Sequence, residues 1–167
     1  MKTKDISLVA LFVTLTIVGA QISIPIGTVP ITLQVLMVFL TGYFLKPTLA
    51  LLTQSIYLLL GIIGLPVFAN FSGGFASIIG PTGGYLIAFP LAAWIISLSK
   101  KDYFSMFLHG ILGIAIIYTL GVLVLNYHLH DFKKAFMIGV VPFIGIDFLK
   151  MCLAVIISKR VLKVVEA

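Results

Sequence analysis

The chain has 167 residues, of which 61% are hydrophobic and only 10% are charged, and its mean hydropathy is +1.24. A soluble domain carries about 25% charged residues, so this composition excludes a water-soluble globule and indicates a single membrane domain. The net charge of +6 does not indicate nucleic-acid binding, because the basic residues are scattered between apolar runs and form no basic stripe.

Six apolar segments approach the roughly 20 residues that span a bilayer. The first has the basic-then-apolar order of a signal peptide but no convincing cleavage site, so we interpret it as a retained helix. Proline, glycine or charged residues separate the segments. The last helix is expected to begin at Pro142, because proline suits the first position of a helix. The expected helices cover residues 5–23, 31–45, 48–64, 84–99, 103–126 and 142–162.

The distribution of Lys and Arg predicts the orientation in the membrane. Six spans place both termini on one side, and a cytoplasmic N-terminus puts eight basic residues inside and two outside. The eight are Lys2, Lys4, Lys46, Lys100, Lys101, Lys159, Arg160 and Lys163, and the two are Lys133 and Lys134. We therefore expect an all-α integral membrane protein with six transmembrane helices and both termini in the cytoplasm. Residues 24–30 and the loop 65–83 then share the outer face.

An ionisable pair lies inside the last expected helix, in "PFIGIDFLKMCLA". Asp147 and Lys150 are three residues apart, which places them on one helix face. From Pro142, at 1.5 Å per residue, they lie about 7 Å and about 12 Å below the outer end. A self-neutralising salt bridge that only packs the helix is one explanation. We favour a polar-ligand site, because nothing structural requires a charged pair in a helix that could be wholly apolar.

The uncharged loop "GLPVFANFSGGFASIIGPTGGY" separates two expected helices. Asn70 offers both amide donors and an acceptor, and the alternative is a turn residue that bonds its own backbone. Its aromatic neighbours could form an interfacial belt or the wall of a pocket, and its glycines let backbone amides approach a ligand closely. Irregular backbone at membrane depth must line a cavity or be buried in protein, so we expect a lid. The aromatic candidates are Phe68, Phe71, Phe75 and Tyr85, and the glycines are Gly73, Gly74, Gly80, Gly83 and Gly84.

Polar residues elsewhere are weaker candidates. Thr32 and Gln34, in "TVPITLQVL", could face the same pocket or act in capping and interfacial solvation. His109 is interpreted as a packed histidine, and the "HLHD" stretch at 128–131 as a solvated loop rather than a metal site. Cys152 is the single cysteine, so no disulfide framework is expected.

No catalytic constellation or nucleotide-binding motif is present: there is no HExxH, no GxSxG and no Walker A sequence. We therefore expect a binding protein rather than an enzyme. Its energy, if it transports, would come from another chain.

Four blocks in chain order resemble the BioY family, the biotin-specific substrate-binding S components of energy-coupling-factor (ECF) transporters. They are "VPITLQVLMVFLTG" (29–42), "YLLLGIIGLPVFANFSGG" (57–74), "GPTGGYLIAF" (80–89) and "DFLK" (147–150). The resemblance runs over essentially the whole chain and implies a six-helix S-component bundle in the cell membrane.

The resemblance also implies roles for individual residues. The ligand would be biotin, carried as a transported molecule and not as a cofactor. Asn70 and Asp147 match positions that hold the ureido ring, while Lys150 would meet the valerate carboxylate or keep Asp147 ionised. Tyr85 and nearby Phe residues would pack the thiophane ring and the acyl chain.

The family's partners are a transmembrane T component and two cytoplasmic ABC-type ATPase subunits. S components commonly dock the T component through small residues four apart on the first helix, often two alanines. The corresponding positions here are Ala10 and Thr14. Threonine in place of the second alanine still permits close helix approach.

Three rival hypotheses remain. An S component for thiamine or riboflavin would need a different pocket: riboflavin asks for a stacking platform, and thiamine for an acid without a neighbouring lysine. A stand-alone ion-coupled carrier would use Asp147 as its proton site. An intramembrane enzyme would use His109 or the "HLHD" loop, although His109 and Asp147 are expected in opposite halves of the membrane.

Overall fold

The structure is a computed structural model that describes residues 2–165, the side chain of Val165 excepted. Over this range the chain forms α-helices, one short 3-10 turn and a two-stranded antiparallel hairpin. The helices are α1 (Thr3–Gln21), α2 (Gln34–Phe44), α3 (Pro47–Ile62), α4 (Phe75–Ile79), α5 (Gly83–Ser97), α6 (Tyr103–Leu129), α7 (Phe132–Gly139) and α8 (Ile144–Val165). The hairpin strands are β1 (Ser23–Ile24) and β2 (Ile31–Thr32), and the 3-10 turn η1 is Ala69–Phe71.

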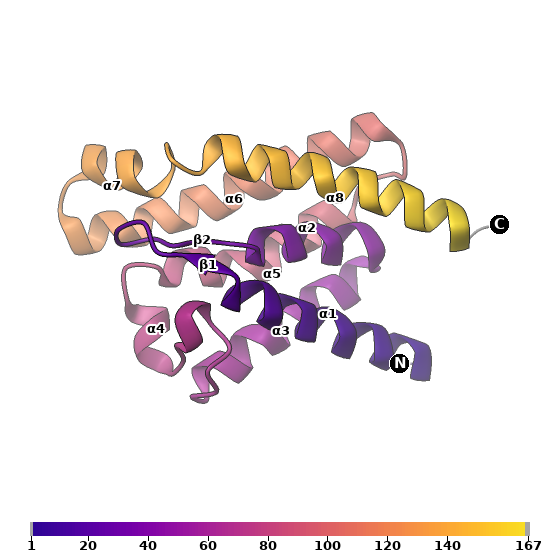
Figure 1. The fold of residues 1–167 in the computed structure, drawn as a ribbon, viewed down its shortest axis with the longest axis horizontal. Coiled ribbons are helices and arrows are strands. Elements are labelled where there is room, and N and C mark those ends of the chain that lie inside the picture. The colour runs from indigo at the N-terminus through magenta and orange to yellow at the C-terminus, as the bar shows by residue number, and fades with distance from the viewer. Residues whose placement is uncertain (1, 166–167) are drawn as a thin grey trace.

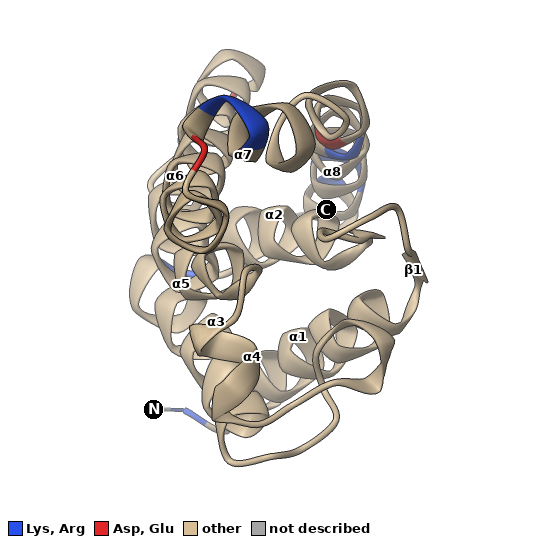
Figure 2. Ribbon diagram, turned by 90° about the vertical axis from the view of Figure 1, so that its left-hand side faces the viewer, with Lys and Arg blue, Asp and Glu red and all other residues tan. Residues whose placement is uncertain are grey.

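The long helices lie side by side, and three of the smaller connecting elements lie at one end of the molecule (Figure 1). The hairpin, α4 and α7 gather at this end, which we call the loop end. The N- and C-terminal parts of the chain lie together at the opposite end, which we call the terminal end. Figure 2 looks onto the loop end and shows the helices arranged around a central region, with the hairpin and α4 at its rim.

Helix α5 forms the centre of the bundle because it is apolar and rich in small residues. It packs against α6, α3 and α2, and Ala88, Ala92 and Ala93 are fully buried at these contacts. Small side chains let helices approach closely in a membrane, where packing replaces the hydrophobic effect as the main source of association. This core fixes α2, α3 and α6 relative to one another.

Large apolar side chains cover the outside of the bundle. Leu149 on α8 is 68% exposed, and similarly exposed leucine, isoleucine and phenylalanine side chains occur along the other long helices. Such a surface is stable only in lipid. The chain is a multi-pass membrane protein.

The structure departs from the expected helices mainly at the loop end. Helix α2 begins at Gln34 and not at residue 31, because Ile31 and Thr32 pair with β1. Helix α8 begins at Ile144 and not at Pro142, because residues 140–143 form a turn that follows the separate helix α7. The expected loop 65–83 contains η1 and α4.

Within residues 2–165, the lengths of the helices limit which of them can span a bilayer. Helices α1 and α6 are long and apolar enough to cross a membrane, and α7 with α8, bent by 43°, could make a third span. Helices α2, α3 and α5 have 11, 16 and 15 residues, fewer than the roughly 20 that span a bilayer. The count of six spans and the cytoplasmic termini therefore remain predictions.

Candidate ligand-binding site

A cavity of about 460 Å³ lies at the loop end, between the helices and the connecting segments. Its volume falls within the roughly 300–1,000 Å³ of small-molecule sites. Segments distant in sequence contribute to its walls: the residues around β2, the turn η1, α4, α5, α6 and the start of α8. The apolar walls include Val29, Val35, Phe68, Leu86, Phe89, Ile117 and Phe143.

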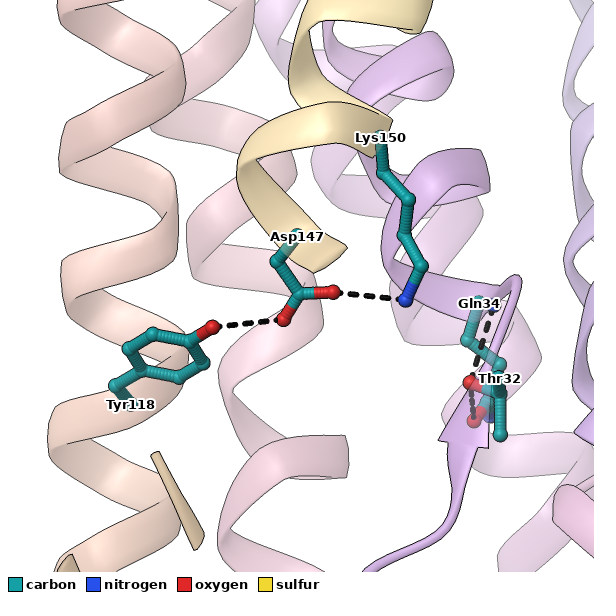
Figure 3. Close-up of polar contacts among 5 residues, drawn as sticks. All are labelled: Thr32, Gln34, Tyr118, Asp147 and Lys150. Carbon is teal, nitrogen blue, oxygen red and sulfur yellow. Dashed lines mark hydrogen bonds and ion pairs between the residues drawn. The ribbon is translucent and has the colours of Figure 1, made fainter. Parts of the chain in front are cut away.

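An ion pair forms one wall of the cavity. Lys150 Nζ lies 2.7 Å from Asp147 Oδ1, and both side chains are buried. Tyr118 of α6 donates a hydrogen bond of 2.9 Å to the other carboxylate oxygen, Oδ2. Figure 3 shows Asp147 held between the two donors, with the Lys150 ammonium on the side that faces Gln34 and Thr32. All of these residues line the cavity.

The start of α8 positions this pair. Asp147 lies in the first turn of the helix, where the unpaired amides give a partial positive charge that stabilises a carboxylate. The backbone N–H of Asp147 donates to Phe143 O at 2.8 Å, and this hydrogen bond closes the first turn of α8. The spacing of three then brings Lys150 onto the same face. The ion pair predicted from the sequence is therefore present and faces the cavity.

Hydrogen bonds orient the polar groups of the opposite wall. Thr32 Oγ1 donates to Gln34 Oε1 at 2.9 Å, and Gln34 Nε2 donates to the Tyr57 hydroxyl at 2.5 Å. Tyr57 in turn donates to Val67 O at 3.1 Å. Figure 3 shows Thr32 and Gln34 across from the ion pair. This chain connects the start of α2 to α3 and to the loop that precedes η1.

Asn70 occupies the turn η1 at the rim of the cavity. Its backbone is left-handed, with φ of 57° and ψ of 37°, a conformation that asparagine adopts more readily than most residues. Ser23 Oγ donates to its Oδ1 at 2.6 Å. Because the oxygen is engaged by Ser23, the amide NH₂ is the group that Asn70 offers to a ligand.

Phe68 and Tyr85 supply aromatic surface. The Phe68 ring packs edge-on against Tyr57, with the ring centroids 5.6 Å apart. The Tyr85 hydroxyl donates to Gly139 O of α7 at 2.9 Å, so one side chain joins α5 to α7 while its ring lines the cavity. Both rings are therefore fixed before any ligand binds.

Six of the candidate residues of the loop lie outside the cavity lining: Phe71, Phe75, Gly73, Gly74, Gly83 and Gly84. Phe71 has 71% of its surface exposed, because its left-handed backbone, with φ of 54°, belongs to a turn at the surface. A side chain at Gly73 would overlap the Leu65 carbonyl, and one at Gly84 would overlap the Leu120 carbonyl of α6. These two glycines thus permit close packing of the backbone, and none of the six candidates lines the cavity.

The histidines have other partners. His109 Nδ1 lies 2.8 Å from the Ser105 carbonyl within α6, and His128 Nε2 lies 2.8 Å from the Ile79 carbonyl at the end of α4. Asp131 caps α7 by accepting from the Lys134 N–H. The "HLHD" stretch therefore joins α6, α7 and α4.

A model of the BioY family matches residues 1–167, the whole chain. The chain belongs to the BioY family. A protein named "Probable biotin transporter BioY" from Pyrococcus horikoshii is 52% identical over 160 residues, which cover 96% of this chain and 97% of that protein. A "Biotin transporter BioY" from Thermotoga maritima is 49% identical over 156 residues, which cover 92% of each chain.

Solved structures share the fold of this BioY-family chain. The S-component for biotin from an ECF-type ABC transporter superposes with a TM-score of 0.88 at 27% identity, covering 98% of this chain and 95% of that one. The S component of a bacterial ECF transporter superposes with a TM-score of 0.58 at 16% identity, over 99% and 97% of the two chains, which shows likeness of fold alone. The expected S-component-like fold is confirmed.

Sequence reasoning missed Tyr118, although a phenol in the apolar run "GIAIIYTLG" was a detectable signal. It also missed Ser23, which no motif distinguishes from other loop serines. The expected docking positions Ala10 and Thr14 are exposed on α1, where the Thr14 hydroxyl donates to the Ala10 carbonyl at 2.9 Å. Because that hydrogen bond satisfies the hydroxyl within α1, the two small side chains can pack closely against another helix.

Proposed function

We propose that this protein captures biotin in the loop-end cavity, as the substrate-binding S component of an ATP-driven uptake system in the cell membrane. The observation that carries the proposal is that Asn70 lines the same cavity as Asp147 and Lys150, which are distant from it in sequence, in a BioY-family fold. The named biotin transporters among its relatives and the biotin S-component structure support the choice of ligand.

The chemistry of the ureido ring matches the two walls. The ring presents two N–H donors and one carbonyl acceptor. Asp147 has lone pairs beyond those used by Lys150 and Tyr118 and can accept one ring N–H, while the Asn70 NH₂ donates to the carbonyl. Charge-assisted hydrogen bonds of this kind are about twice as strong as neutral ones.

Lys150 acts in this proposal mainly as the counter-ion of Asp147. Of the two roles considered for it, the 2.7 Å ion pair favours the one in which Lys150 pairs with Asp147 over the one in which it meets the valerate carboxylate. An ammonium has three donors, so the remaining N–H groups stay available to a polar group of the ligand. Phe68 and Tyr85, with Phe89 and Phe143, supply apolar surface for the thiophane ring and the acyl chain.

Partners supply the energy. We expect a transmembrane T component and two cytoplasmic ABC-type ATPase subunits, with Ala10 and Thr14 on the docking face. With both termini in the cytoplasm, as the sequence predicts, the loop end faces outward and the terminal end faces the cytoplasm. The basic residues of the terminal end then satisfy the positive-inside rule, and the loop that carries η1 and α4 forms the lid.

Titration calorimetry of the detergent-purified protein tests the binding step. We expect biotin to bind with a sub-micromolar Kd and Asn70→Ala to weaken it by at least about tenfold, the cost of one lost hydrogen bond in a desolvated site. Biotin binding weaker than micromolar, or an Asn70→Ala variant with unchanged affinity, would overturn the assignment. Mass spectrometry of the protein as extracted provides an independent readout, because a high-affinity ligand is retained through purification.

Competition separates biotin from other vitamins, and vesicles separate the energy sources. Desthiobiotin retains the ureido ring and the acyl chain and should displace biotin, whereas thiamine and riboflavin should not. Uptake into vesicles that contain the T component and ATPases should depend on ATP. Uptake driven by a pH gradient with this chain alone would instead support the ion-coupled carrier.

A further inference from the structure

The turn that carries Asn70 is strained and needs support from outside itself. Asn70 and Phe71 have consecutive positive φ angles of 57° and 54°. This conformation is costly for residues other than glycine, and more so for a bulky side chain such as phenylalanine. Residues in such conformations persist only where the surrounding structure holds them.

One end of this turn is held by packing. Phe68 is buried against Tyr57, and a side chain at Gly61 would overlap its ring. Its backbone N–H also donates to Ser72 O at 3.0 Å, which closes the turn. Phe71, in contrast, exposes 71% of its surface and gains little support from packing.

Gln21, the last residue of α1, holds both ends of the turn at once. Its Nε2 donates to Phe68 O at 3.1 Å, and its Oε1 accepts from Phe71 N at 2.9 Å. The two bonds bracket Asn70. Because one partner is a carbonyl and the other an N–H, only a side chain with both a donor and an acceptor can make the pair. Glutamine satisfies this requirement, and an ionised glutamate does not.

The residues after Gln21 extend the same support. Ser23 Oγ donates to Asn70 Oδ1, and Ser23 pairs with Thr32 in the hairpin. Gln21 and Ser23 are not among the described residues that line the cavity. They therefore act on the site only through residues that do line it.

We propose that Gln21 is the positioning residue of the ligand site, which holds the left-handed turn so that the Asn70 amide points at the ureido oxygen. Ser23 assists by fixing the rotation of that amide. This inference rests on the proposed biotin function and adds to it a specificity element at the end of α1. The same three-residue segment, 21–23, joins the Asn70 turn to the Thr32 wall, so it sets the distance across the mouth of the cavity.

The test is a double-mutant cycle on the full-length protein, with biotin Kd as the readout. Gln21→Met keeps the length and the helix propensity of the side chain but removes both hydrogen bonds. We expect it to weaken biotin binding by about tenfold. The partner variant, Asn70→Gly, removes the amide while tolerating the positive φ. In the Asn70→Gly background, Gln21→Met should change the Kd by less than about twofold, because residues that act through one another are not additive.

A second readout separates positioning from general loosening of the fold. In 2-iminobiotin the ureido oxygen is replaced by an imino nitrogen, which in its protonated form offers N–H to Asn70 in place of an acceptor. Discrimination between biotin and 2-iminobiotin should fall in Gln21→Met to the value seen in Asn70→Gly. Ser7→Ala is the matched control: it removes an exposed hydroxyl that donates to the Thr3 carbonyl of the same helix and should leave both Kd and discrimination unchanged.

The outcomes are distinct. Wild-type protein that fails to bind biotin overturns the proposed function and this inference with it. If the wild-type protein binds biotin, an unchanged Kd in Gln21→Met overturns the inference alone. A tenfold loss of affinity caused by Gln21→Met in the Asn70→Gly background also overturns it. If Gln21→Met does not fold, Gln21→Glu replaces it in the cycle, since it keeps the acceptor for Phe71 N–H and loses the donor to Phe68 O. Its affinity is expected between those of wild type and Asn70→Gly, and a wild-type affinity would overturn the inference.

Discussion

Two clusters of polar side chains, buried except for the half-buried Tyr118, differ in what surrounds them. The first, which we call the cavity cluster, consists of Thr32, Gln34, Tyr118, Asp147 and Lys150 and lines the open space at the loop end. The second, which we call the sealed cluster, consists of Thr16, Thr41 and Gln54, all with 0% exposure, on α1, α2 and α3. Both would count equally as buried polar groups in an apolar protein.

The side chains of the sealed cluster bond to one another and to the carbonyls of their own helices. Gln54 Nε2 donates to both threonine hydroxyls, at 3.1 and 3.0 Å, and Thr16 and Thr41 donate to the carbonyls of their own helices. The cluster is uncharged and joins three helices. Such hydrogen bonds between membrane helices contribute about 0.6 kcal/mol on average.

The cavity cluster, in contrast, contains an ion pair and keeps unused lone pairs and N–H groups towards open space. Burial alone therefore does not identify a ligand site in this protein. Charge together with an adjacent cavity does. The predictions below test that distinction, in order of decreasing effect on biotin affinity.

Asp147→Asn should have the largest effect, a loss of affinity of about 100-fold or more. It removes the charged acceptor for a ureido N–H group and leaves Lys150 buried without its counter-ion. Calorimetric titration measures the affinity. In the double variant Asp147→Asn/Lys150→Met, thermal stability should recover while affinity stays low. Recovery of affinity as well would show that the pair serves packing and not ligand binding.

Tyr118→Phe should weaken biotin binding by about three- to tenfold. It deletes the hydroxyl that donates to Asp147 Oδ2 while keeping the ring that lines the cavity, and hydrogen bonds to charged groups contribute about 1.5–3 kcal/mol. Part of this loss is offset if water replaces the hydroxyl. The same titration measures it, and an unchanged Kd would show that Lys150 alone is enough to orient the carboxylate.

Phe71→Ala should change the biotin Kd by less than about twofold, because this side chain is exposed and lies outside the cavity. Phe68→Ala is the matched comparison at the other end of the same turn, where the ring is buried and lines the cavity, and it should weaken binding clearly. A strong effect of Phe71→Ala would show that the lid rearranges to bring this ring over the ligand.

Gln54→Met should leave biotin affinity unchanged and lower the free energy of unfolding by about 1–2 kcal/mol, through the loss of its two hydrogen bonds. The amide oxygen of Gln54 has no partner among the described residues, which reduces the net cost of replacing it. Thermal denaturation in detergent and titration with biotin measure the two quantities. A large loss of affinity would contradict the distinction between the clusters.

Sequence patterns predicted the elements that depend on local composition. Each apolar run contains a helix, of 11 to 27 residues, since an uncharged stretch can satisfy its backbone in lipid only as a helix. The Asp147–Lys150 pair was predictable for a related reason: charge is costly in a membrane and indicates function. Asn70 was predictable because it is the one amide in a neutral loop.

Sequence patterns did not predict the features that depend on contacts between residues far apart along the chain. The turn at 140–143 and the short helix α7 replaced the expected start at Pro142, because Tyr85 from α5 bonds to Gly139 and fixes that corner from outside the segment. Gly73 and Gly84 were assigned to the ligand but lie against the carbonyls of Leu65 and Leu120. A glycine that serves backbone packing and one that serves a ligand look the same in sequence.

The sequence by itself determined that the protein lies in lipid and that its apolar runs contain helices. It also identified the charged and amide side chains that are candidates for a ligand site. Only the tertiary structure decided that Asn70, Thr32, Gln34, Tyr118 and Asp147 face one space and that Gln54 faces none. The physical reason is that hydropathy acts on each segment separately, whereas a cavity is the space that several segments jointly leave unfilled. Its position follows from side-chain contacts between residues far apart along the chain.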